Sequence, residues 1–219
     1  MIDAKLKCVF VHCQKCAGES IEEAIFGRAD NNYGGDPFEG SPEKHFSARQ
    51  YISKYGPNVW QEYFTFAIVR NPWDRVISRI KYRDKRYGRV DPITPEKIKR
   101  EVQSSVFVKN SYTNLLCDQN RRILVDFVGR FENLPDDFNY IVQKVGLGSL
   151  TLPHLNRTAH EDFRKYYDYD SMQLVGQIFR DDIKLLGYSF HNDPCRQCPK
   201  RFDAFGLCDR CPSAGVDRQ

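Results

Sequence analysis

The sequence predicts an α/β protein with three layers, in which helices flank a central parallel β-sheet. Two observations predict this class. Residues 8–11 (CVFV) and 63–69 (YFTFAIV) are short runs that are apolar almost throughout, as is typical of strands buried on both faces of a sheet. Each run leads through a short polar loop into a stretch with apolar residues at helical spacing. Repeated strand and helix units favour a parallel sheet.

Size and composition limit the classes of function. The chain has 219 residues, 41% hydrophobic and 28% charged, which is ordinary globular composition. A net charge of +4 suits a small anionic ligand and is too weak to indicate nucleic acid. No stretch approaches the roughly 18 apolar residues of a membrane span, and the first apolar run is too short for a signal peptide. We therefore expect a soluble, cytoplasmic protein.

The first strand is followed by a loop that carries a lysine. A helix is expected to begin near Gly18 or Glu19, because Ile21, Ala24 and Ile25 form an apolar face. The first backbone N–H groups of a helix are unpaired, and its dipole favours negative charge there. Lys15 adds an ammonium group to this loop. The pattern predicts a phosphate-type ligand at the end of the first strand.

The same loop allows two other interpretations. Lys15 could be a solvated residue in a plain strand–helix connection. Alternatively, Cys13 and Cys16 form a C-x-x-C pair between a strand and a helix, which is the placement of the redox pair in a thiol–disulfide oxidoreductase. The loop is not a Walker A motif, because Gly18 follows the lysine instead of preceding it.

The second strand, 63–69, runs directly into Arg70. A helix follows over 76–87, with Pro72 suited to its first turn. Ligands of open α/β sheets bind at the carboxyl ends of the strands. Cations at two such ends, Lys15 and Arg70, favour an anion site more strongly than either does alone.

The rest of the first 190 residues reads as further α/β structure. Ser47 is a plausible N-cap, and Gly56-Pro57 is expected to end the helix that it starts. The apolar stripe of the last predicted helix is expected to pack in the core. We expect a loop over 27–43, helices over 48–55, 96–108, 135–144 and 168–186, and a third strand over 122–129.

The last segment, 191–219, differs from the domain 1–190. It holds two C-x-x-C pairs separated by nine residues, Cys195 with Cys198 and Cys208 with Cys211. Two such pairs are typical of a structural zinc site with four thiolate ligands, and few apolar residues are present to order the tail otherwise. Two disulfides or a disordered tail are the alternatives. A zinc-knuckle module that binds a partner without catalysis is a further alternative for the protein's function.

Three stretches resemble the sulfotransferases of the Golgi carbohydrate and bacterial type, which use 3′-phosphoadenosine-5′-phosphosulfate (PAPS). VFVHCQKCAGESI (9–21) resembles the family's 5′-phosphosulfate loop, and YFTFAIVRNPWDRVIS (63–78) resembles its 3′-phosphate motif. VGRFENLPDDFNYIVQKVGL (128–147) and parts of 152–190 resemble its C-terminal half. The resemblance covers about residues 8 to 190 and implies a fold like that of the nucleotide kinases. It also implies transfer of a sulfonate group from PAPS to an acceptor hydroxyl, on a carbohydrate, without a catalytic metal.

The resemblance assigns roles residue by residue. Lys15 corresponds to the lysine that contacts the sulfonate and stabilises the leaving oxygen, and His45 lies where related enzymes carry a general-base histidine. Arg70 and Ser78 correspond to the pair that holds the 3′-phosphate. Arg157 is expected to close over the nucleotide. The implied nucleotide-binding set is Lys15, Cys16, Ala17, Gly18, Glu19, Ser20, Arg70, Ser78 and Arg157.

The 5′-phosphosulfate loop departs from the family pattern. Gln14, Cys16 and Ala17 replace proline, threonine and glycine, and Glu19 stands where a hydroxyl residue is usual. Alanine adopts positive φ angles less readily than glycine. A carboxylate beside a phosphosulfate is unfavourable unless it turns away.

Overall fold

The computed structural model describes residues 1–27, 44–104, 110–153 and 161–191. Its sheet has four strands in the order β1-β2-β3-β4. Strands β2 (Cys8–Val11), β3 (Phe64–Val69) and β4 (Phe127–Arg130) are parallel, while β1 (Ile2–Asp3) pairs antiparallel with β2. The predicted α/β class is confirmed, with the correction that the sheet is mixed at one edge. Two residues are too few to give β1 a recognisable pattern.

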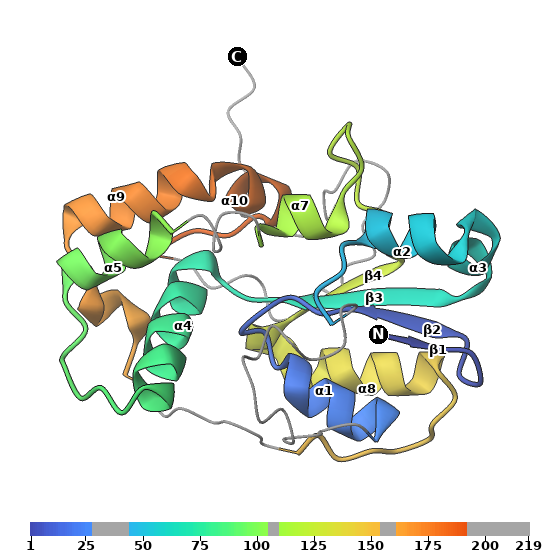
Figure 1. Ribbon diagram of the computed structural model, residues 1–219. Helices are drawn as coiled ribbons and strands as arrows, with labels where there is room; N and C mark the ends of the chain where they lie inside the picture. Colours follow the sequence, from blue (N-terminus) through green and yellow to red (C-terminus); the bar gives the residue numbers. More distant parts are fainter. Residues whose placement is uncertain (28–43, 105–109, 154–160, 192–219) are drawn as a thin grey trace.

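Helices cover both faces of this sheet, so the predicted layers are present (Figure 1). Helices α1 (Gly18–Phe26) and α8 (Leu134–Lys144) lie on one face, and α2 (Ala48–Tyr55), α3 (Pro57–Glu62) and α7 (Tyr112–Leu116) on the other. Beyond the carboxyl ends of the strands lie α4 (Pro72–Arg86), α5 (Pro95–Val102), α9 (Tyr169–Ile178) and α10 (Arg180–Leu186). Two short 3-10 helices complete the described elements, η1 (Phe131–Asn133) and η2 (Phe163–Tyr166).

Helix α2 ends before Gly56-Pro57 as predicted, and Pro57 in addition opens α3, because proline is well suited to a first helical position. Other predicted boundaries are wrong. The third strand is shifted, and Ile123 forms only an isolated bridge with Cys117. The single helix expected over 168–186 is two helices that meet at Phe179, whose ψ of 23° departs from helical geometry. The apolar stripe continues across this junction, so periodicity alone does not reveal it.

Local sequence explains why the elements that carry the site begin where they do. Ser47 and Gln50 form a capping box at the start of α2, as expected for an N-cap serine. At α4, the Asn71 side chain accepts a hydrogen bond from the Trp73 backbone N–H, and Pro72 occupies the first turn. Each cap fixes where a helix begins, α2 shortly after His45 and α4 directly after Arg70.

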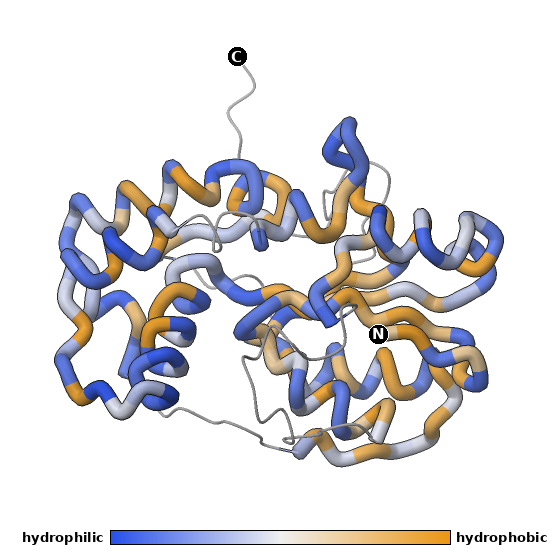
Figure 2. Tube along the Cα trace, viewed as in Figure 1, coloured by the Kyte–Doolittle hydropathy of each residue, from blue (hydrophilic) through white to orange (hydrophobic). Residues whose placement is uncertain are grey.

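The apolar residues form two clusters. One surrounds strands β2 to β4, which appear as mostly orange segments in Figure 2. The other joins α4, α5 and α9 through Trp73, Ile80, Ile98 and Val175. None of the helices in the described ranges is both long and apolar enough to cross a membrane. Because α4 is anchored in the second cluster and β3 in the first, the connection between them sits at the boundary of two packed units.

Candidate active site

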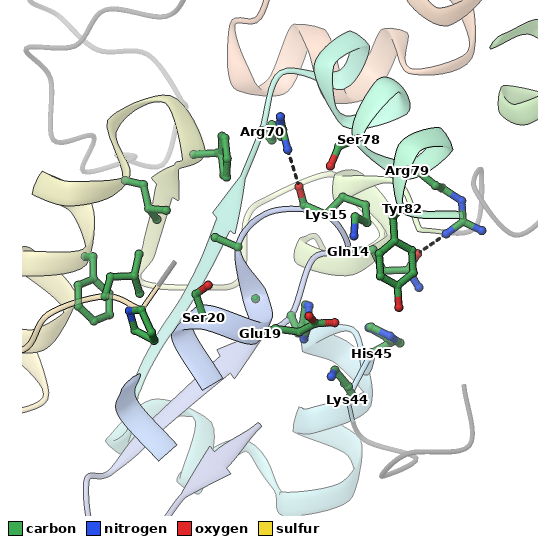
Figure 3. Close-up of a pocket in the computed structure, with 18 of the residues that line it drawn as sticks. Gln14, Lys15, Glu19, Ser20, Lys44, His45, Arg70, Ser78, Arg79 and Tyr82 are labelled. Carbon is green, nitrogen blue, oxygen red and sulfur yellow. Dashed lines mark hydrogen bonds between the residues drawn. The ribbon is translucent and has the colours of Figure 1, made fainter. Parts of the chain in front are cut away.

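A cavity of about 830 Å³ opens at the carboxyl ends of β2 and β3. These strands are parallel neighbours, so the loops that follow them meet at one edge of the sheet. The cavity is shown in Figure 3. Of the residues implied to bind the nucleotide or to act as the base, nine lie in the described chain. Eight of these nine line the cavity: Lys15, Ala17, Gly18, Glu19, Ser20, His45, Arg70 and Ser78.

The loop after β2 has an unusual backbone. Lys15 and Ala17 both lie in the left-handed region, with φ of 64° and 63°. Ala17 is the N-cap residue of α1, and its side chain makes no capping hydrogen bond. Gly18, Glu19 and Ser20, the first residues of α1, line the cavity, where a bound anion could take the place of a cap.

Gly18 is required by a close approach of His12. A Cβ atom at position 18 would lie 2.0 Å from Nε2 of the His12 ring. The other ring nitrogen of His12, Nδ1, lies 2.6 Å from Oε1 of Glu22, one turn into α1. His12 therefore links the end of β2 to α1 and fixes how the loop approaches the cavity.

Lys15 lies in the loop that precedes this helix end and lines the cavity. Its Nζ atom lies 3.6 Å from the centre of the Tyr82 ring on α4. Burial lowers the pKa of Lys15 to about 8, with Glu19 opposing the shift and Arg70 adding to it. The Lys15 carbonyl accepts a hydrogen bond from Arg70 Nη1 at 3.4 Å, so the two loops are in direct contact.

Arg70 is held rigidly at the end of β3. Its Nε donates to Asp74 Oδ2 at 2.6 Å, and its guanidinium stacks 4.0 Å from the centre of the Phe131 ring. The Tyr112 hydroxyl donates to the Arg70 carbonyl at 2.8 Å and accepts from the Arg70 N–H at 3.0 Å. Ser78, two turns into α4, lines the same cavity. The spacing of eight residues therefore does not separate Ser78 from Arg70 in space.

His45 lies across the cavity from α4, just before α2. Its ring is edge-on to that of His12, with the ring centres 5.1 Å apart. Burial lowers the pKa of His45 to about 3, and nearby Lys44 also lowers it. The imidazole is thus neutral near pH 7. Lys44 Nζ lies 3.2 Å from Glu22 Oε2, which ties this segment to α1.

The cysteine pair does not fit redox chemistry. Cys13 and Cys16 are each 1% exposed, and burial raises the pKa of both thiols. A redox pair needs an accessible thiolate with a lowered pKa, so the oxidoreductase interpretation is wrong. The side chain of Cys16, a residue of the predicted nucleotide-binding set, faces away from the cavity. Its Sγ atom lies 3.4 Å from the Tyr112 hydroxyl in the core, and only its backbone can face the loop.

The structure leaves other predicted residues untested. Arg157 and the four cysteines expected to bind zinc, Cys195, Cys198, Cys208 and Cys211, lie outside the described residues. Within those residues, no group of three His, Cys, Asp or Glu side chains could hold a metal ion.

Sequence reasoning missed part of the lining. Gln14 and Lys44 lie beside predicted residues. Four residues of α4, all beyond Ser78, also line the cavity: Arg79, Tyr82, Arg83 and Arg86. The spacing of Tyr82 and Arg86, one and two helical repeats of four residues after Ser78, is the signal that could have found those two. An apolar side comes from η1, α8 and residues 150–153, where the lining includes Phe131, Leu134, Phe138 and Leu152.

Comparison with known proteins agrees with this geometry. The sequence model of the sulfotransferase family matches residues 1–107 and 110–189. An uncharacterized protein of Archaeoglobus fulgidus is 30% identical over 117 residues, which is 52% of this chain and 92% of that protein. No solved structure gives a significant match.

Proposed function

Because this chain belongs to the sulfotransferase family, we propose that it transfers a sulfonate group from PAPS to an acceptor hydroxyl, on a carbohydrate. The observation that carries the proposal is the contact between two cationic loops. Lys15 and Arg70 follow neighbouring parallel strands, meet through a hydrogen bond and line one cavity. Sulfotransferases usually take PAPS as the sulfonate donor, and this nucleotide carries anionic groups at both of its ends.

The loop after β2 suits the reactive end of PAPS. The uncapped start of α1 offers N–H groups at Gly18, Glu19 and Ser20, and the Ser20 hydroxyl can add a donor. Lys15 supplies a compact positive charge that can reach the bridging oxygen. Gly18 keeps the backbone free of a Cβ atom on the side of His12, which allows the loop to hold this shape.

The 3′-phosphate is assigned to Arg70 and Ser78. Asp74 accepts from Arg70 Nε and the Lys15 carbonyl accepts from Nη1, and Arg70 lines the cavity, where its guanidinium can also make charge-assisted hydrogen bonds to a phosphate. Phe131, against which Arg70 stacks, belongs to the apolar side of the cavity. A flat, weakly polar adenine suits this side.

The chemistry follows from the charges of two groups. Sulfonate transfer, like phosphoryl transfer, depends on in-line positioning and on stabilisation of charge at the oxygens. Lys15, whose pKa is lowered to about 8, is mostly protonated at pH 7 and becomes more so beside an anion. His45 is neutral and can accept the acceptor's proton. A bound phosphosulfate would raise the pKa of His45 from its low value and improve it as a base.

A pair of nucleotides tests the proposal. Calorimetry should show that PAP, the product nucleotide, binds far more tightly than AMP, which lacks the 3′-phosphate. Arg70→Gln should reduce this preference by roughly tenfold or more, because it removes a charge-assisted contact. Arg100→Gln is the matched control, since Arg100 is an exposed arginine of α5 that does not line the cavity. Equal affinities of the wild-type protein for PAP and AMP would refute the assignment.

A further inference from the structure

We propose that Tyr82 of α4 is a positioning residue of the proposed reaction, whose ring holds the Lys15 ammonium ready for the 5′ end of the nucleotide. The inference rests on the proposed function, in which Lys15 stabilises the leaving oxygen, and it adds a residue outside the motifs that carry that function. Its basis is the contact between these two side chains, together with a second contact, between Gln14 and Arg79, that docks the loop on the helix.

The Lys15 ammonium lies on the face of the Tyr82 ring. Nζ is 3.6 Å from the ring centre, well inside the distance of about 6 Å at which an aromatic face attracts a cation. Both side chains line the cavity, and Tyr82 is half-buried. Among the described residues, Tyr82 belongs to neither of the two apolar clusters, so packing in the core does not account for this ring. Its contact with Lys15 does.

An aromatic ring can hold a lysine without neutralising it. An ammonium group has three N–H donors. A carboxylate as its direct partner would cancel the charge and would have to be displaced by an anionic ligand, whereas a ring face leaves the charge and the remaining donors available. The ring also favours the protonated form of Lys15, as does the charge of Glu19, against the burial that lowers the pKa of Lys15 to about 8. Tyr82 therefore holds Lys15 in the protonation state that a phosphosulfate requires.

Two further contacts dock the same loop on α4. Arg75 Nε donates to the Gln14 carbonyl at 3.0 Å, and Arg79 Nη1 donates to Gln14 Oε1 at 3.1 Å. Arg75, Arg79 and Tyr82 follow one another at intervals of four and three residues, so they lie on one face of the helix. Figure 3 shows Arg79 and Tyr82 on this helix, with the hydrogen bond between Arg79 and Gln14 dashed. One face of α4 thus fixes two consecutive residues of the loop.

Gln14 explains how the loop keeps its position without the proline of the family pattern. A proline fixes its own φ but has no side-chain acceptor, so it could offer only its carbonyl to Arg75. The glutamine adds the contact with Arg79, and it is buried. Arg79 is itself fixed, because its Nε donates to Oε1 of Glu101 on α5 at 2.7 Å. The substitution therefore replaces local rigidity by a contact that holds the loop against α4.

Holding the lysine in advance favours binding and reaction. A lysine side chain has four rotatable bonds, and fixing them before the nucleotide arrives removes an entropic cost from binding. The reaction also requires the ammonium to be placed accurately at the bridging oxygen. If Tyr82 acts through Lys15, it should contribute to affinity only for nucleotides that carry a 5′-phosphate.

Two adenosine nucleotides isolate this contribution. PAP and adenosine 3′-phosphate share the group that is assigned to Arg70 and Ser78, and only PAP has a 5′-phosphate for Lys15. Calorimetry with the full chain gives the ratio of the two affinities. Tyr82→Leu should lower this ratio roughly fivefold, whereas Tyr82→Phe keeps the ring and should retain most of it. Tyr169→Leu, at an exposed tyrosine outside the cavity lining, is the matched control and should leave the ratio unchanged.

Variants of the loop show whether the effect passes through the lysine. In a Lys15→Met background the ratio is already low, and adding Tyr82→Leu should lower it no further. Gln14→Met removes the side-chain acceptor for Arg79 but keeps the carbonyl that Arg75 uses. It should lower the ratio in the wild-type background and have no effect in the Lys15→Met background.

Three results would overturn the positioning role. They are an unchanged ratio in Tyr82→Leu, as expected if the ring only packs and both nucleotides lose affinity equally, an equal loss in Tyr82→Phe, or a further loss in the Lys15→Met background. If the wild-type protein still prefers PAP to adenosine 3′-phosphate in that case, the proposed function stands. A wild-type protein that binds neither nucleotide, or both equally, would instead refute the proposed function itself.

Discussion

Glu22 Oε1 and His12 Nδ1 lie 2.6 Å apart in the buried space beneath the loop that follows β2. The second oxygen of Glu22 lies 3.2 Å from Lys44 Nζ, next to His45 in the chain. Its partners lower the pKa of Glu22 although burial would raise it. One carboxylate thus joins β2, α1 and the segment that carries the candidate base.

Glu22→Gln should therefore destabilise the fold. The amide keeps the shape but removes the charge that His12 and Lys44 share, and breaking a buried charged pair costs about 3 kcal/mol. Chemical denaturation of both proteins measures the loss. Glu62→Gln, at an exposed position of α3, is the control and should change the free energy of unfolding by less than about 0.5 kcal/mol. A Glu22 variant as stable as this control would show that the link is unimportant.

Gly18→Ala should disrupt the loop through His12. The new Cβ atom would lie 2.0 Å from the ring, so either the ring or the loop must move, at a cost of about 1 to 3 kcal/mol. Adding His12→Ala should recover part of that loss, because the clashing ring is gone. Gly176→Ala on α9 is a glycine-to-alanine control that should not destabilise the protein. Its Cβ would meet Trp73 at an ordinary 3.4 Å, and alanine favours helix by about 1 kcal/mol.

The affinity for PAP should depend on pH through Lys15. The Lys15 pKa of about 8 means that the lysine is protonated in the free protein below pH 8 and loses its proton above it. Binding an anion above pH 8 then requires proton uptake, so the affinity should fall by up to about tenfold per pH unit. Calorimetry at pH 7 and 9.5 in two buffers of different ionisation heat measures both effects. The Lys15→Arg variant keeps its positive charge over this pH range, so its affinity for PAP should not fall. An identical pH profile for both proteins would contradict the role of Lys15.

His45 should make the protein sensitive to acid. Its pKa is about 3 in the folded protein and about 6.5 when exposed, so between these values only the unfolded chain takes up the proton. Stability then falls as pH falls through this window, by at most about 1.4 kcal/mol per pH unit. Urea denaturation from pH 7 to 4 should therefore give a steeper decline for the wild-type protein than for His45→Gln. Parallel declines would show that the pKa of His45 is not lowered.

Much of the fold could be predicted from local patterns. The runs 8–11 and 63–69 are apolar on both faces, and a cation follows each of them. The sequence therefore predicts two buried strands that end at the same edge of the sheet, each with a cation beyond its end. Strand β1 and helix α3 were missed because each is short and gains its order from tertiary pairing. The junction at Phe179 was hidden by an apolar stripe that continues across it.

Site residues that belong to a sequence motif could be predicted, whereas residues whose orientation depends on tertiary packing could not. Arg70 and Ser78 came from one motif, and both line the cavity. The orientation of Cys16 depends on Tyr112, which is 96 residues away, and no local signal reveals it. Arg79 and Arg83 of α4 line the cavity and donate to Glu101 on a different helix, a pairing that only the folded chain brings together.

A crystal structure with PAP tests the central claim most directly. The nucleotide should lie in the cavity with its 5′-phosphate at the start of α1, beside Lys15, and its 3′-phosphate within hydrogen-bond distance of Arg70 and Ser78. The adenine should lie on the apolar side, near Phe131. PAP bound in the opposite direction, or outside this cavity, would contradict the account.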